Sequence, residues 1–495
     1  GTGSFAVTYG AHAGIGTLPV VFFGTDDQRR RYLPGLAAGT LVAAYALTEP
    51  GAGSDAMAIR TRAARLPDGR FRLEGAKQFI TNAGFADLFT VYAKVDGEAF
   101  TAFLVERQDP GLLVGAEEAK LGIHGASTCP VTFDGTIVGP DRVLGEIGRG
   151  YRVAFNILNV GRFKLAAACL GAMRPALATA VAYASERRAF GRPIAAFPLV
   201  AGKLAGMATR IYAVESLVYQ LAGLVDARLA AAEAEAAGEA GAQAQDGAQE
   251  GAREAYRRAL EEYAVECSIA KVFASEALDR VVDELVQIHG GYGYVESYPA
   301  ARAYRDARIN RIWEGTNEIN RLLIPGMLLR RAMKGHLPLF QAAQRLQKEL
   351  LEPSFEEPED REAAYVQNLK KLALMVMGLA ALRFGEKVEE EQEVLAAAAD
   401  ILIETYAAES GLLRARRLGG VAQAMARFYL LQALDRAQVR ALGVLPRLAE
   451  GDELRLALSA ARRLTKREAL DLVAIRREVA QAVLEREGYP LAVLK

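Results

Sequence analysis

The sequence predicts a mainly α-helical protein with a central antiparallel β domain and an extra helical domain at its C-terminal end. The spacing of apolar residues changes from helical to alternating over residues 58–144, and it returns to helical after Gly145. An acidic, proline-containing segment, "LEPSFEEPEDRE", then precedes a last stretch that reads as helix throughout. We therefore divide the chain into four parts, which are residues 1–50, 51–147, 148–335 and 336–495.

The first two parts differ in the period of their apolar residues. Residues 1–50 contain the amphipathic segment "DDQRRRYLPGL", and Asp26 suits the start of that helix. Residues 51–147 contain stretches such as "RFRLEGAKQFI" and "DLFTVYAKV", in which apolar and polar side chains alternate between short turns. This pattern is typical of antiparallel strands in a small barrel or sandwich.

The other two parts are expected to be helical. Long amphipathic stretches cover residues 150–229 and 254–286. Between them, residues 230–252 carry acidic charge and no large apolar side chain, which is typical of a mobile, solvated insertion. The basic amphipathic stretch 412–442 is expected to place its apolar face in the domain core, with contact to a membrane or a protein partner as the alternative.

Composition argues against several classes of partner. The 495 residues include 60 Lys and Arg against 60 Asp and Glu, so no excess charge points to nucleic acid or an anionic membrane as the main partner. No apolar run approaches the ~20 residues of a membrane-spanning helix. The chain also lacks an alternating βαβ pattern with a glycine-rich fingerprint, which argues against a nicotinamide-binding Rossmann fold.

Cysteine and histidine usage predicts no metal site. Cys129, Cys169 and Cys267 are far apart in the sequence, which favours reduced thiols in a cytosol-like compartment. None of the four histidines forms a zinc-type pair. We expect a cytoplasmic protein, and we expect a further segment to precede the first residues, which read like the middle of a domain.

Glu314, in "RIWEGTNEIN", is the main candidate for acid–base chemistry. Gly315 breaks the preceding helix and Thr316 suits the N-cap of the next one, so the carboxylate projects from a helix junction beside Trp313. If that junction faces a closed cavity, desolvation raises the pKa of the carboxylate toward neutrality, which suits proton abstraction. The alternative is a solvated glutamate between two helices.

Two stretches near the β domain can bind a ligand. "ALTEPGAGSDA" places Gly53 and Ser54 in a turn whose N–H groups can converge on a phosphate, although such turns also occur without a ligand. In "QFITNAG", Phe79 and Thr81 alternate with an inward-facing Ile80. A flat apolar surface beside a hydroxyl suits a planar ring, but strand residues alternate in this way by default.

Two further stretches lie in the helical part. "SERRAFGRPI" places Arg187 and Phe190 about one helical turn apart. "QIHGGYGYV" places Gln287 and Gly291 where backbone can approach a ligand. Either stretch can also be a plain helix end with a glycine cap.

Taken together, these stretches resemble one family. The sequence is similar to the acyl-CoA dehydrogenases, and most of all to their very-long-chain branch, from about Phe5 to Arg330. The matching motifs include "LTEPGAGSD", "ITNAGFADLFTVYAK", "NVGRFKLAAACLGAMR", "ERRAFGRPI", "QIHGGYGYVESYPAARAYRDARI" and "RIWEGTNEI", in the family's order. The resemblance implies that family's α, β-barrel, α architecture with an extra C-terminal helical domain.

The resemblance also implies an activity. It predicts an FAD-dependent acyl-CoA dehydrogenase that converts a fatty acyl-CoA, of long or very long chain, to the trans-2-enoyl-CoA in fatty acid β-oxidation. Glu314 matches the family's catalytic base, which removes the α-proton while the β-hydride passes to flavin N5. Gly161 rules out a base at the position that some relatives use, and Arg162 matches a basic residue near the catalytic carboxylate.

Cofactor and substrate contacts follow from the same resemblance. The residues expected to contact FAD, some of them in a neighbouring subunit, are Tyr45, Leu47, Thr48, Gly53, Ser54, Phe79, Thr81, Arg187, Phe190, Gln287, Gly291, Thr316 and Glu318. The residues expected at the substrate are Ser54, Arg162, Trp313 and Gly315. Phe79 stands where tryptophan is common, and Ala201 and Glu318 stand where many members have glutamine.

Partners are implied as well. The resemblance predicts an electron-transferring flavoprotein as acceptor, and at least a dimer, because the family completes its cofactor site across subunits. It predicts a homodimer, because in the long branch the extra helical domain occupies the surface through which two dimers pack in shorter relatives. Small residues in "YGAHAGIG" favour a deep acyl channel. Two alternatives are an acyl-CoA oxidase, which is reoxidised by oxygen, and a non-enzymatic assembly protein built on the same fold.

Overall fold

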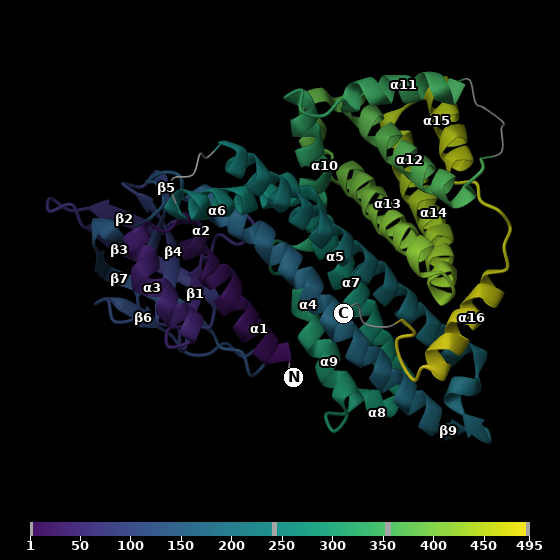
Figure 1. Ribbon diagram of the computed structural model, residues 1–495, viewed down its shortest axis with the longest axis horizontal. Coiled ribbons are helices and arrows are strands. Elements are labelled where there is room, and N and C mark those ends of the chain that lie inside the picture. Colours follow the sequence, from purple (N-terminus) through teal and green to yellow (C-terminus); the bar gives the residue numbers. More distant parts are fainter. Residues whose placement is uncertain (1–2, 240–244, 352–357, 492–495) are drawn as a thin grey trace. The chain divides into compact units, whose positions relative to one another are not determined.

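We describe the protein from a computed structural model that covers residues 3–239, 245–351 and 358–491 (Figure 1). Its contacts divide the chain into two compact units. The sheet unit comprises Gly1–Lys164 and Gly223–Ala264, and the helical unit comprises Leu165–Ala222 and Val265–Lys495. Two long helices, α4 (Gly150–Glu186) and α5 (Pro198–Glu239), contribute residues to both units. The division into four parts made from the sequence remains a prediction.

Short helices open the sheet unit, namely α1 (Gly3–Ala11), a π-helical turn (His12–Gly16), α2 (Leu18–Phe23) and α3 (Asp26–Ala38). Thr25, rather than Asp26, caps α3. The Thr25 hydroxyl accepts a hydrogen bond from the Gln28 N–H at 3.2 Å, and the Gln28 side chain accepts one from the Thr25 N–H at 3.0 Å. Asp26 is the first helical residue, where its charge complements the helix dipole. The cap predicted from the sequence was therefore wrong by one residue.

A single sheet forms the centre of this unit. Its strands are β1 (Ala43–Ala46), β2 (Arg62–Arg65), β3 (Phe71–Thr81), β4 (Leu88–Val95), β5 (Ala99–Glu106), β6 (Leu112–Val114), β7 (Thr128–Val138) and β8 (Val143–Leu144). Their order is β6-β7-β3-β2-β4-β5-β8, with β1 also beside β4. Neighbouring strands are antiparallel as predicted, except that β1 and β2 run parallel to β4. Side-chain alternation does not distinguish the two directions, and so the sequence did not reveal the parallel pairs.

β4 is buried on both of its faces. Phe89 and Val91 pack into one apolar cluster with Phe71 and Phe103 of neighbouring strands. Tyr92 packs into a second cluster, which the N-terminal helices and the start of α4 also form. Because helices cover one face of the sheet, β4 consists almost entirely of apolar residues and sits at the centre of the unit.

The segment expected to be a mobile insertion is largely helical. α5 continues to Glu239, and α6 (Gln245–Glu262) begins shortly afterwards. α6 packs against the sheet unit's own helices, with the ring of Tyr256 stacked 5.3 Å from that of Phe22. The part of that expectation that concerns residues 240–244 lies outside the described residues.

The helical unit continues with a small hairpin and a series of helices. The hairpin pairs β9 (Arg188–Ala189) with β10 (Arg192–Pro193). The next helices are α7 (Ala264–His289), α8 (Gly291–Tyr294), α9 (Pro299–Arg308) and α10 (Asn317–Met333), with a 3-10 turn (Ile309–Arg311) before α10. The C-terminal helices are α11 (Leu339–Leu351), α12 (Arg361–Phe384), α13 (Gln392–Leu418), α14 (Val421–Leu448), α15 (Gly451–Leu464) and α16 (Leu472–Glu485).

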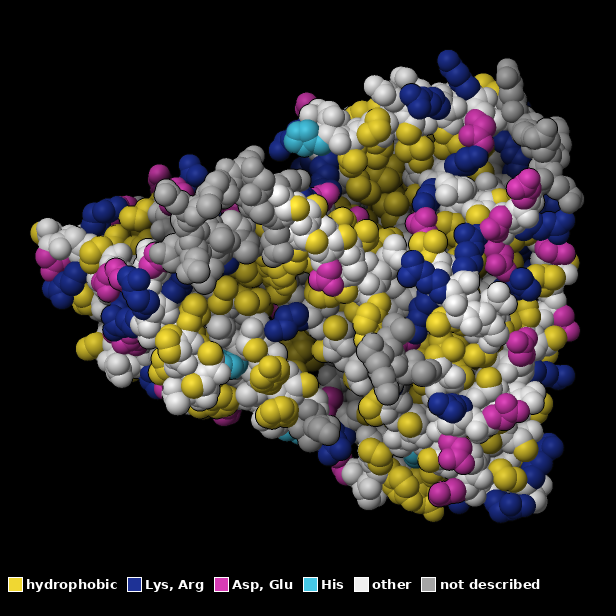
Figure 2. Space-filling view, viewed as in Figure 1, with side chains coloured by type: hydrophobic (Ala, Val, Ile, Leu, Met, Phe, Trp, Pro, Cys, Tyr) yellow, Lys and Arg dark blue, Asp and Glu magenta, His cyan; other side chains and the backbone are white. Residues whose placement is uncertain are grey.

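The C-terminal helices form a packed bundle. α12, α13 and α14 pack on one another, and α13 also packs on α10 (Figure 1). The stretch 412–442 buries Phe428, Leu431 and Leu434 of α14 in this bundle, so its apolar face is domain core, as expected. On the visible face of the molecule, basic and acidic side chains are interspersed, in keeping with their equal numbers (Figure 2).

In the part of the chain that the structure describes, two helical stretches are long and apolar enough to cross a membrane, contrary to the expectation from the sequence. They are Gly3–Phe23 and Gly150–Glu186, and the sequence reading missed them because they contain scattered polar residues. Core helices of proteins without any membrane segment pass the same test, and half of the second apolar window is buried inside the protein. Length and composition alone therefore give only weak evidence for a membrane span.

Candidate active site

Glu314 lies in a strained loop between the Ile309–Arg311 turn and α10. Its φ is 57°, a left-handed conformation that a residue with a Cβ adopts at a cost of about 1–2 kcal/mol. Gly315 follows with a φ of 78°, which glycine adopts without that cost. Thr316 then caps α10, as expected, by accepting a hydrogen bond from the Ile319 N–H at 3.3 Å. The half-buried carboxylate is thus carried on a sharp backbone turn.

Asn320 and Lys271, both fully buried, hold this turn from inside the helical unit. The Asn320 side-chain amide donates to the carbonyl oxygens of Glu314 at 3.3 Å, Gly315 at 2.8 Å and Thr316 at 3.0 Å. The Lys271 ammonium, from α7, donates to the Gly315 carbonyl oxygen at 2.7 Å. Such strain persists only where surrounding contacts fix it, and these contacts fix the peptides around Glu314.

The Asn317 side chain links Lys271 to Ser275 and Glu276 by hydrogen bonds. Its carbonyl oxygen accepts a hydrogen bond from the Lys271 ammonium at 2.7 Å. Its amide nitrogen donates to Ser275 at 3.1 Å and to the Glu276 carboxylate at 3.0 Å. The first residue of α10 is therefore tied to α7 through its side chain as well as through helix packing.

The other residues predicted beside the base lie on the same loop. Trp313 is half-buried, and its indole N–H donates to the Asn310 side chain at 3.2 Å. Glu318 is exposed in the first turn of α10, where its own backbone N–H and the Thr316 hydroxyl lower the pKa of its carboxyl group. The structure thus brings Trp313, Gly315, Thr316 and Glu318 together around Glu314.

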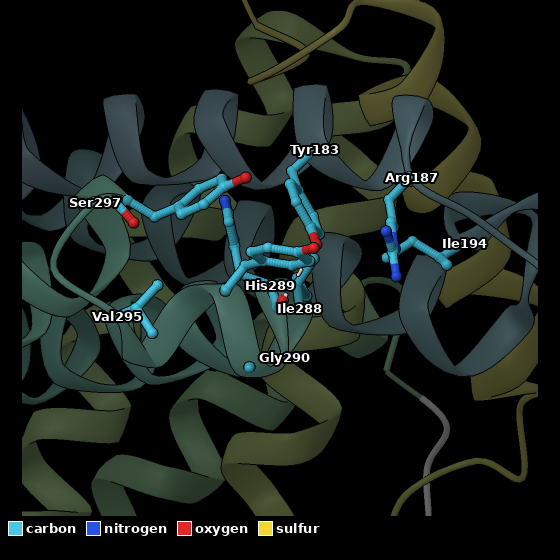
Figure 3. A pocket seen from close by; sticks show the side chains of 11 residues that line it. Tyr183, Arg187, Ile194, Ile288, His289, Gly290, Val295 and Ser297 are labelled. Carbon is cyan, nitrogen blue, oxygen red and sulfur yellow. Dashed lines mark hydrogen bonds between the residues drawn. The ribbon is translucent and has the colours of Figure 1, made fainter.

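A pocket of about 570 Å³ lies elsewhere in the helical unit (Figure 3). Arg187 stands at one side of it, and Val295 and Ser297 stand at the other. The rings of Tyr183 and His289 stack at 4.1 Å in its wall, and burial lowers the pKa of His289. The imidazole is therefore kept neutral, and the pocket presents mainly aromatic and backbone groups beside one guanidinium.

Glycines line the same pocket. Gly290 has a φ of 59°, and Gly291 begins α8. A Cβ built on either residue would meet no atom within 4 Å, so the packing of the chain does not require glycine at Gly291. Gln287, also predicted as a contact, is exposed at the end of α7 and is not among the lining residues.

Phe190 occupies the tip of the β9–β10 hairpin. Phe190 and Gly191 have φ values of 50° and 79°, as a two-residue turn with two left-handed positions requires. The phenylalanine side chain is 95% exposed and touches Phe197 edge-on at 6.0 Å. The hairpin separates it from Arg187, so the helical spacing expected for the two residues is wrong: α4 ends at Glu186.

In the sheet unit, the segment after β1 forms the second group of predicted residues. Tyr45 is half-buried with its ring edge-on to Tyr92 at 5.2 Å, and Leu47 is buried. The Thr48 carbonyl accepts a hydrogen bond from the Gln78 N–H at 2.9 Å, which sets this segment beside β3. Further along, the loop turns outward into solvent.

Glycine and serine form the outward part of that loop. Gly53 and Ser54 are exposed, and a Cβ on Gly53 would meet no atom within 4 Å. The turn itself is closed by two backbone hydrogen bonds between Glu49 and Ala52, at 3.0 and 3.1 Å. Chain packing therefore leaves the surface of Gly53 open to a ligand.

A buried ion pair anchors the start of this loop. The Glu49 carboxylate accepts hydrogen bonds from the Lys77 ammonium at 2.7 Å and from the N–H groups of Arg60 at 2.6 Å and Thr61 at 3.1 Å. Burial alone would raise the pKa of Glu49, but these donors outweigh it and lower that pKa. Burial lowers the pKa of Lys77 to about 8. The pair holds the loop that contains Leu47 against β3.

Phe79 projects from β3 at a bulge. The register with β7 shifts between Lys77 and Ile80, and Phe79 has a φ of 59°. Ile80 is buried, as expected, whereas Phe79 is 59% exposed and Thr81 is half-buried. A bulge commonly re-aims a side chain near a functional site, and here it turns an aromatic ring outward.

Arg162 lies in the sheet unit's part of α4. Its guanidinium is buried and donates to the Asn159 side chain at 2.9 Å. The predicted site residues therefore form two groups, one in each unit, and each group is described within its own unit. Among the described residues, no three His, Cys, Asp or Glu side chains form a cluster that could hold a metal ion.

Comparisons with known proteins identify the family. The N-terminal, middle and C-terminal domain models of the acyl-CoA dehydrogenases match residues 1–40, 44–136 and 148–329, and a further C-terminal domain model of this family matches residues 368–463. A probable acyl-CoA dehydrogenase of Bacillus subtilis is 46% identical over 98% of this chain and 82% of its own length. The chain belongs to the acyl-CoA dehydrogenase family.

Two further comparisons extend this finding. The crystal structure of an acyl-CoA dehydrogenase complexed with FAD, from Bacillus anthracis, has a TM-score of 0.93 and 44% identity over 99% of this chain and 83% of that one. The human mitochondrial very-long-chain-specific acyl-CoA dehydrogenase is 41% identical, but the match covers only 64% of this chain and 45% of the human protein. The resemblance noted in the motifs is confirmed, as are the predicted fold class and the enzyme class of FAD-dependent oxidoreductases.

Sequence reasoning found the exposed residues of this acyl-CoA dehydrogenase site and missed most of the buried ones. Lys271, Asn320 and the Glu49–Lys77 pair were not predicted, although they fix both loops. Their signal in the sequence is weak, because a lysine in a helix or strand is usually solvated. The asparagine pair in "TNEIN" was the available clue, since asparagine is uncommon inside helices.

Proposed function

We propose that this acyl-CoA dehydrogenase oxidises a fatty acyl-CoA at its α and β carbons, with Glu314 as the base that removes the α-proton. The observation that carries the proposal is the conformation of Glu314, a left-handed residue held by a buried amide and a buried ammonium. Strained residues fixed in this way cluster at active sites. A solvated glutamate in a plain interhelical loop would need no such support.

Open surfaces within each unit support the proposal that FAD binds to this chain. Gly53 and Gly291 leave open surface that chain packing does not use, and Phe79 offers an exposed aromatic face. When bound, FAD supplies the acceptor for the β-hydride. The residues proposed to hold it are Tyr45, Leu47, Thr48, Gly53, Ser54, Phe79, Thr81, Thr316 and Glu318, with Arg187, Phe190, Gln287 and Gly291 serving the cofactor of a second subunit.

The chain's own groups would prepare the substrate for proton loss. An α-proton of a thioester is too weakly acidic for a carboxylate unless the developing enolate oxygen is stabilised. The backbone N–H of Glu314 is proposed as one donor to that oxygen. Apolar surroundings strengthen such a hydrogen bond, and Trp313 is proposed to contribute to them. Arg162 is proposed to orient the carboxylate.

The remaining proposals concern partners and chain length. We propose a long-chain substrate, an electron-transferring flavoprotein as acceptor, a homodimer and a cytoplasmic location. Small residues in the α1 region support the first point, since a Cβ on Gly10 would meet no atom within 4 Å. At Gly14 a Cβ would lie 2.9 Å from the Lys164 ammonium, which is the far end of a flexible side chain and can shift away, so packing does not require glycine there either.

The experiment is anaerobic mixing of the purified flavoprotein with acyl-CoAs of increasing chain length. We expect loss of the oxidised-flavin absorbance, and we expect Glu314→Gln to slow it by at least about 100-fold, the usual contribution of a general base. Glu453→Gln, which makes the same change at an exposed glutamate in the first turn of α15, outside the proposed site, is the control. A Glu314→Gln variant as fast as the wild type would refute the assignment.

Measurements on the same purified protein distinguish the proposed function from its two alternatives. Rapid formation of peroxide in air would indicate an acyl-CoA oxidase. A chain that binds no FAD on reconstitution, or one whose cellular role survives Glu314→Gln, would indicate an assembly protein on this fold.

A further inference from the structure

The C-terminal helices contact the active-site loop through a chain of charged side chains. Arg321, on α10, donates to the Asp400 carboxylate of α13 at 2.7 Å. The same guanidinium donates to both oxygens of Glu276 on α7, at 2.7 and 3.0 Å. Arg321 thereby joins three helices through one rigid group.

The chain continues from Glu276 to the loop. Glu276 also accepts the hydrogen bond from Asn317, and Asn317 accepts one from Lys271. Lys271 in turn donates to the Gly315 carbonyl, one peptide from the proposed base. An unbroken path of hydrogen bonds therefore runs from Asp400 of the C-terminal bundle to the strained turn.

The charges along this path hold the Arg321 guanidinium between the Glu276 and Asp400 carboxylates. Burial alone would lower the pKa of Arg321, but the Glu276 and Asp400 carboxylates outweigh it and raise that pKa. Asp400 is held from its other side by Arg440 of α14, at 2.9 Å. The guanidinium of Arg321 is therefore a fixed centre with little freedom to turn, and its position sets that of Glu276 and Asn317.

We propose that Asp400 is a positioning residue for the active-site loop, so that the C-terminal bundle helps to set the geometry of Glu314. This inference rests on the proposed function for its effect on turnover. Its effect on the loop can be measured independently. Loss of the Asp400 charge releases one side of Arg321, and the disturbance reaches Gly315 through Glu276, Asn317 and Lys271.

A neighbouring residue provides a matched control. Glu404 lies one helical turn after Asp400 on α13 and accepts hydrogen bonds from Arg436 of α14 at 2.6 and 2.7 Å, and from Tyr429 at 2.6 Å. These contacts remain inside the C-terminal bundle. Glu404→Gln therefore removes a similar charge from the same helix without touching α10.

The first measurement is hydrogen–deuterium exchange of peptides that cover residues 312–320. We expect faster exchange in Asp400→Asn than in wild type, no change in Glu404→Gln, and wild-type exchange in Asp400→Glu, which keeps the charge. Equal exchange in Asp400→Asn and Glu404→Gln would overturn the proposal, even if the protein had no acyl-CoA dehydrogenase activity.

The second measurement is turnover of the FAD-loaded enzyme at saturating acyl-CoA. We expect kcat to fall about 3- to 10-fold in Asp400→Asn with KM within about 2-fold, a range typical of mutations that act through a coupled network. The acidic limb of the pH profile, along which the catalytic base loses its proton, should move as well, because the surroundings of that base change. Wild-type kcat in Asp400→Asn would contradict the proposal, whereas an inactive wild type would contradict the proposed function alone.

Discussion

Two buried lysines hold the two candidate loops, and they do so with different partners. Lys77, in the sheet unit, donates to the Glu49 carboxylate at 2.7 Å and to the Leu47 carbonyl at 3.2 Å. Lys271, in the helical unit, holds its loop through the neutral oxygens of Gly315 and Asn317, both at 2.7 Å. Both side chains have no exposed surface.

The charge of the partner decides whether each lysine matters more for the stability of the protein or for the geometry of its loop. Removing Lys77 leaves a carboxylate buried without its cation, which is among the most costly changes in a folded protein. Removing Lys271 takes one donor from two neutral oxygens, which Asn320 and Ser275 still contact, and this costs less. The first lysine is therefore expected to matter most for folding, and the second for the placement of Glu314.

Lys77→Met should show the largest loss of stability. We expect the free energy of unfolding to fall by about 3–5 kcal/mol, because the buried Glu49 keeps its charge and its neutral donors but loses its cation. Urea unfolding with a fluorescence or circular dichroism readout measures it. The double variant Lys77→Met/Glu49→Gln should recover part of the loss; if it is no more stable than the single variant, the buried charge is not the cause.

Lys271→Met should lower the free energy of unfolding less than Lys77→Met does, but it should lower turnover more. We expect a loss of about 1–3 kcal/mol from the two lost hydrogen bonds to the ammonium, together with a fall in kcat as the Gly315 peptide shifts. Ser275→Ala is the control, since Ser275 contacts Asn317 but no carbonyl of the loop. Equal turnover in the two variants would argue against the positioning role of Lys271.

The strain at Glu314 predicts a smaller effect than either lysine variant, and here a substitution is expected to relieve a cost. Glu314→Gly should be more stable than Glu314→Ala by about 1 kcal/mol, because only glycine adopts a positive φ freely. At Val439, an exposed residue in the interior of α14, the order should reverse, with glycine less stable than alanine by about 1 kcal/mol. Unfolding of all four variants tests both signs, and a lack of reversal would show that Glu314 is not strained.

His289 extends the comparison to a buried base that stays neutral. Its pKa is lowered by burial, so the unfolded chain binds a proton more readily than the folded one as the pH drops. The stabilising contribution is therefore complete above about pH 6.5, the ordinary histidine value, and is lost as the pH falls through the lower folded pKa. Thermal unfolding from pH 7.5 to 5 should show a steeper decline in wild type than in His289→Gln.

Local patterns in the sequence predicted the classes of structure well. The change from helical to alternating period located the sheet, and Gly315 with Thr316 located the break before α10. What the sequence did not show are features set by distant partners. The parallel pairing of β1 and β2 with β4 and the bulge at Phe79 depend on neighbours far along the chain.

The predicted helix boundaries were wrong for a related reason. Arg187 and Phe190 have the spacing of a helix, but a two-residue turn after Ala189 makes a hairpin instead, since Gly191 permits it. The acidic, alanine-rich stretch 230–252 has the composition of an insertion, yet α5 extends to Glu239 and α6 resumes at Gln245. Alanine and glutamate are strong helix formers, and that propensity decided the outcome there.

The double parallel pairing of β4 has a consequence for how the chain is made. β1 aligns Ala43 with Leu88, and β2 aligns Arg62 with Lys94, so neither strand finds that partner until β4 has been synthesised. The loop between β1 and β2 contains Gly53 and Ser54, and the strands at both of its ends pair with β4. In a nascent chain that ends before Leu88, β1 would therefore lack its partner strand. Forming such pairs between strands that are far apart in the sequence is the slow part of folding.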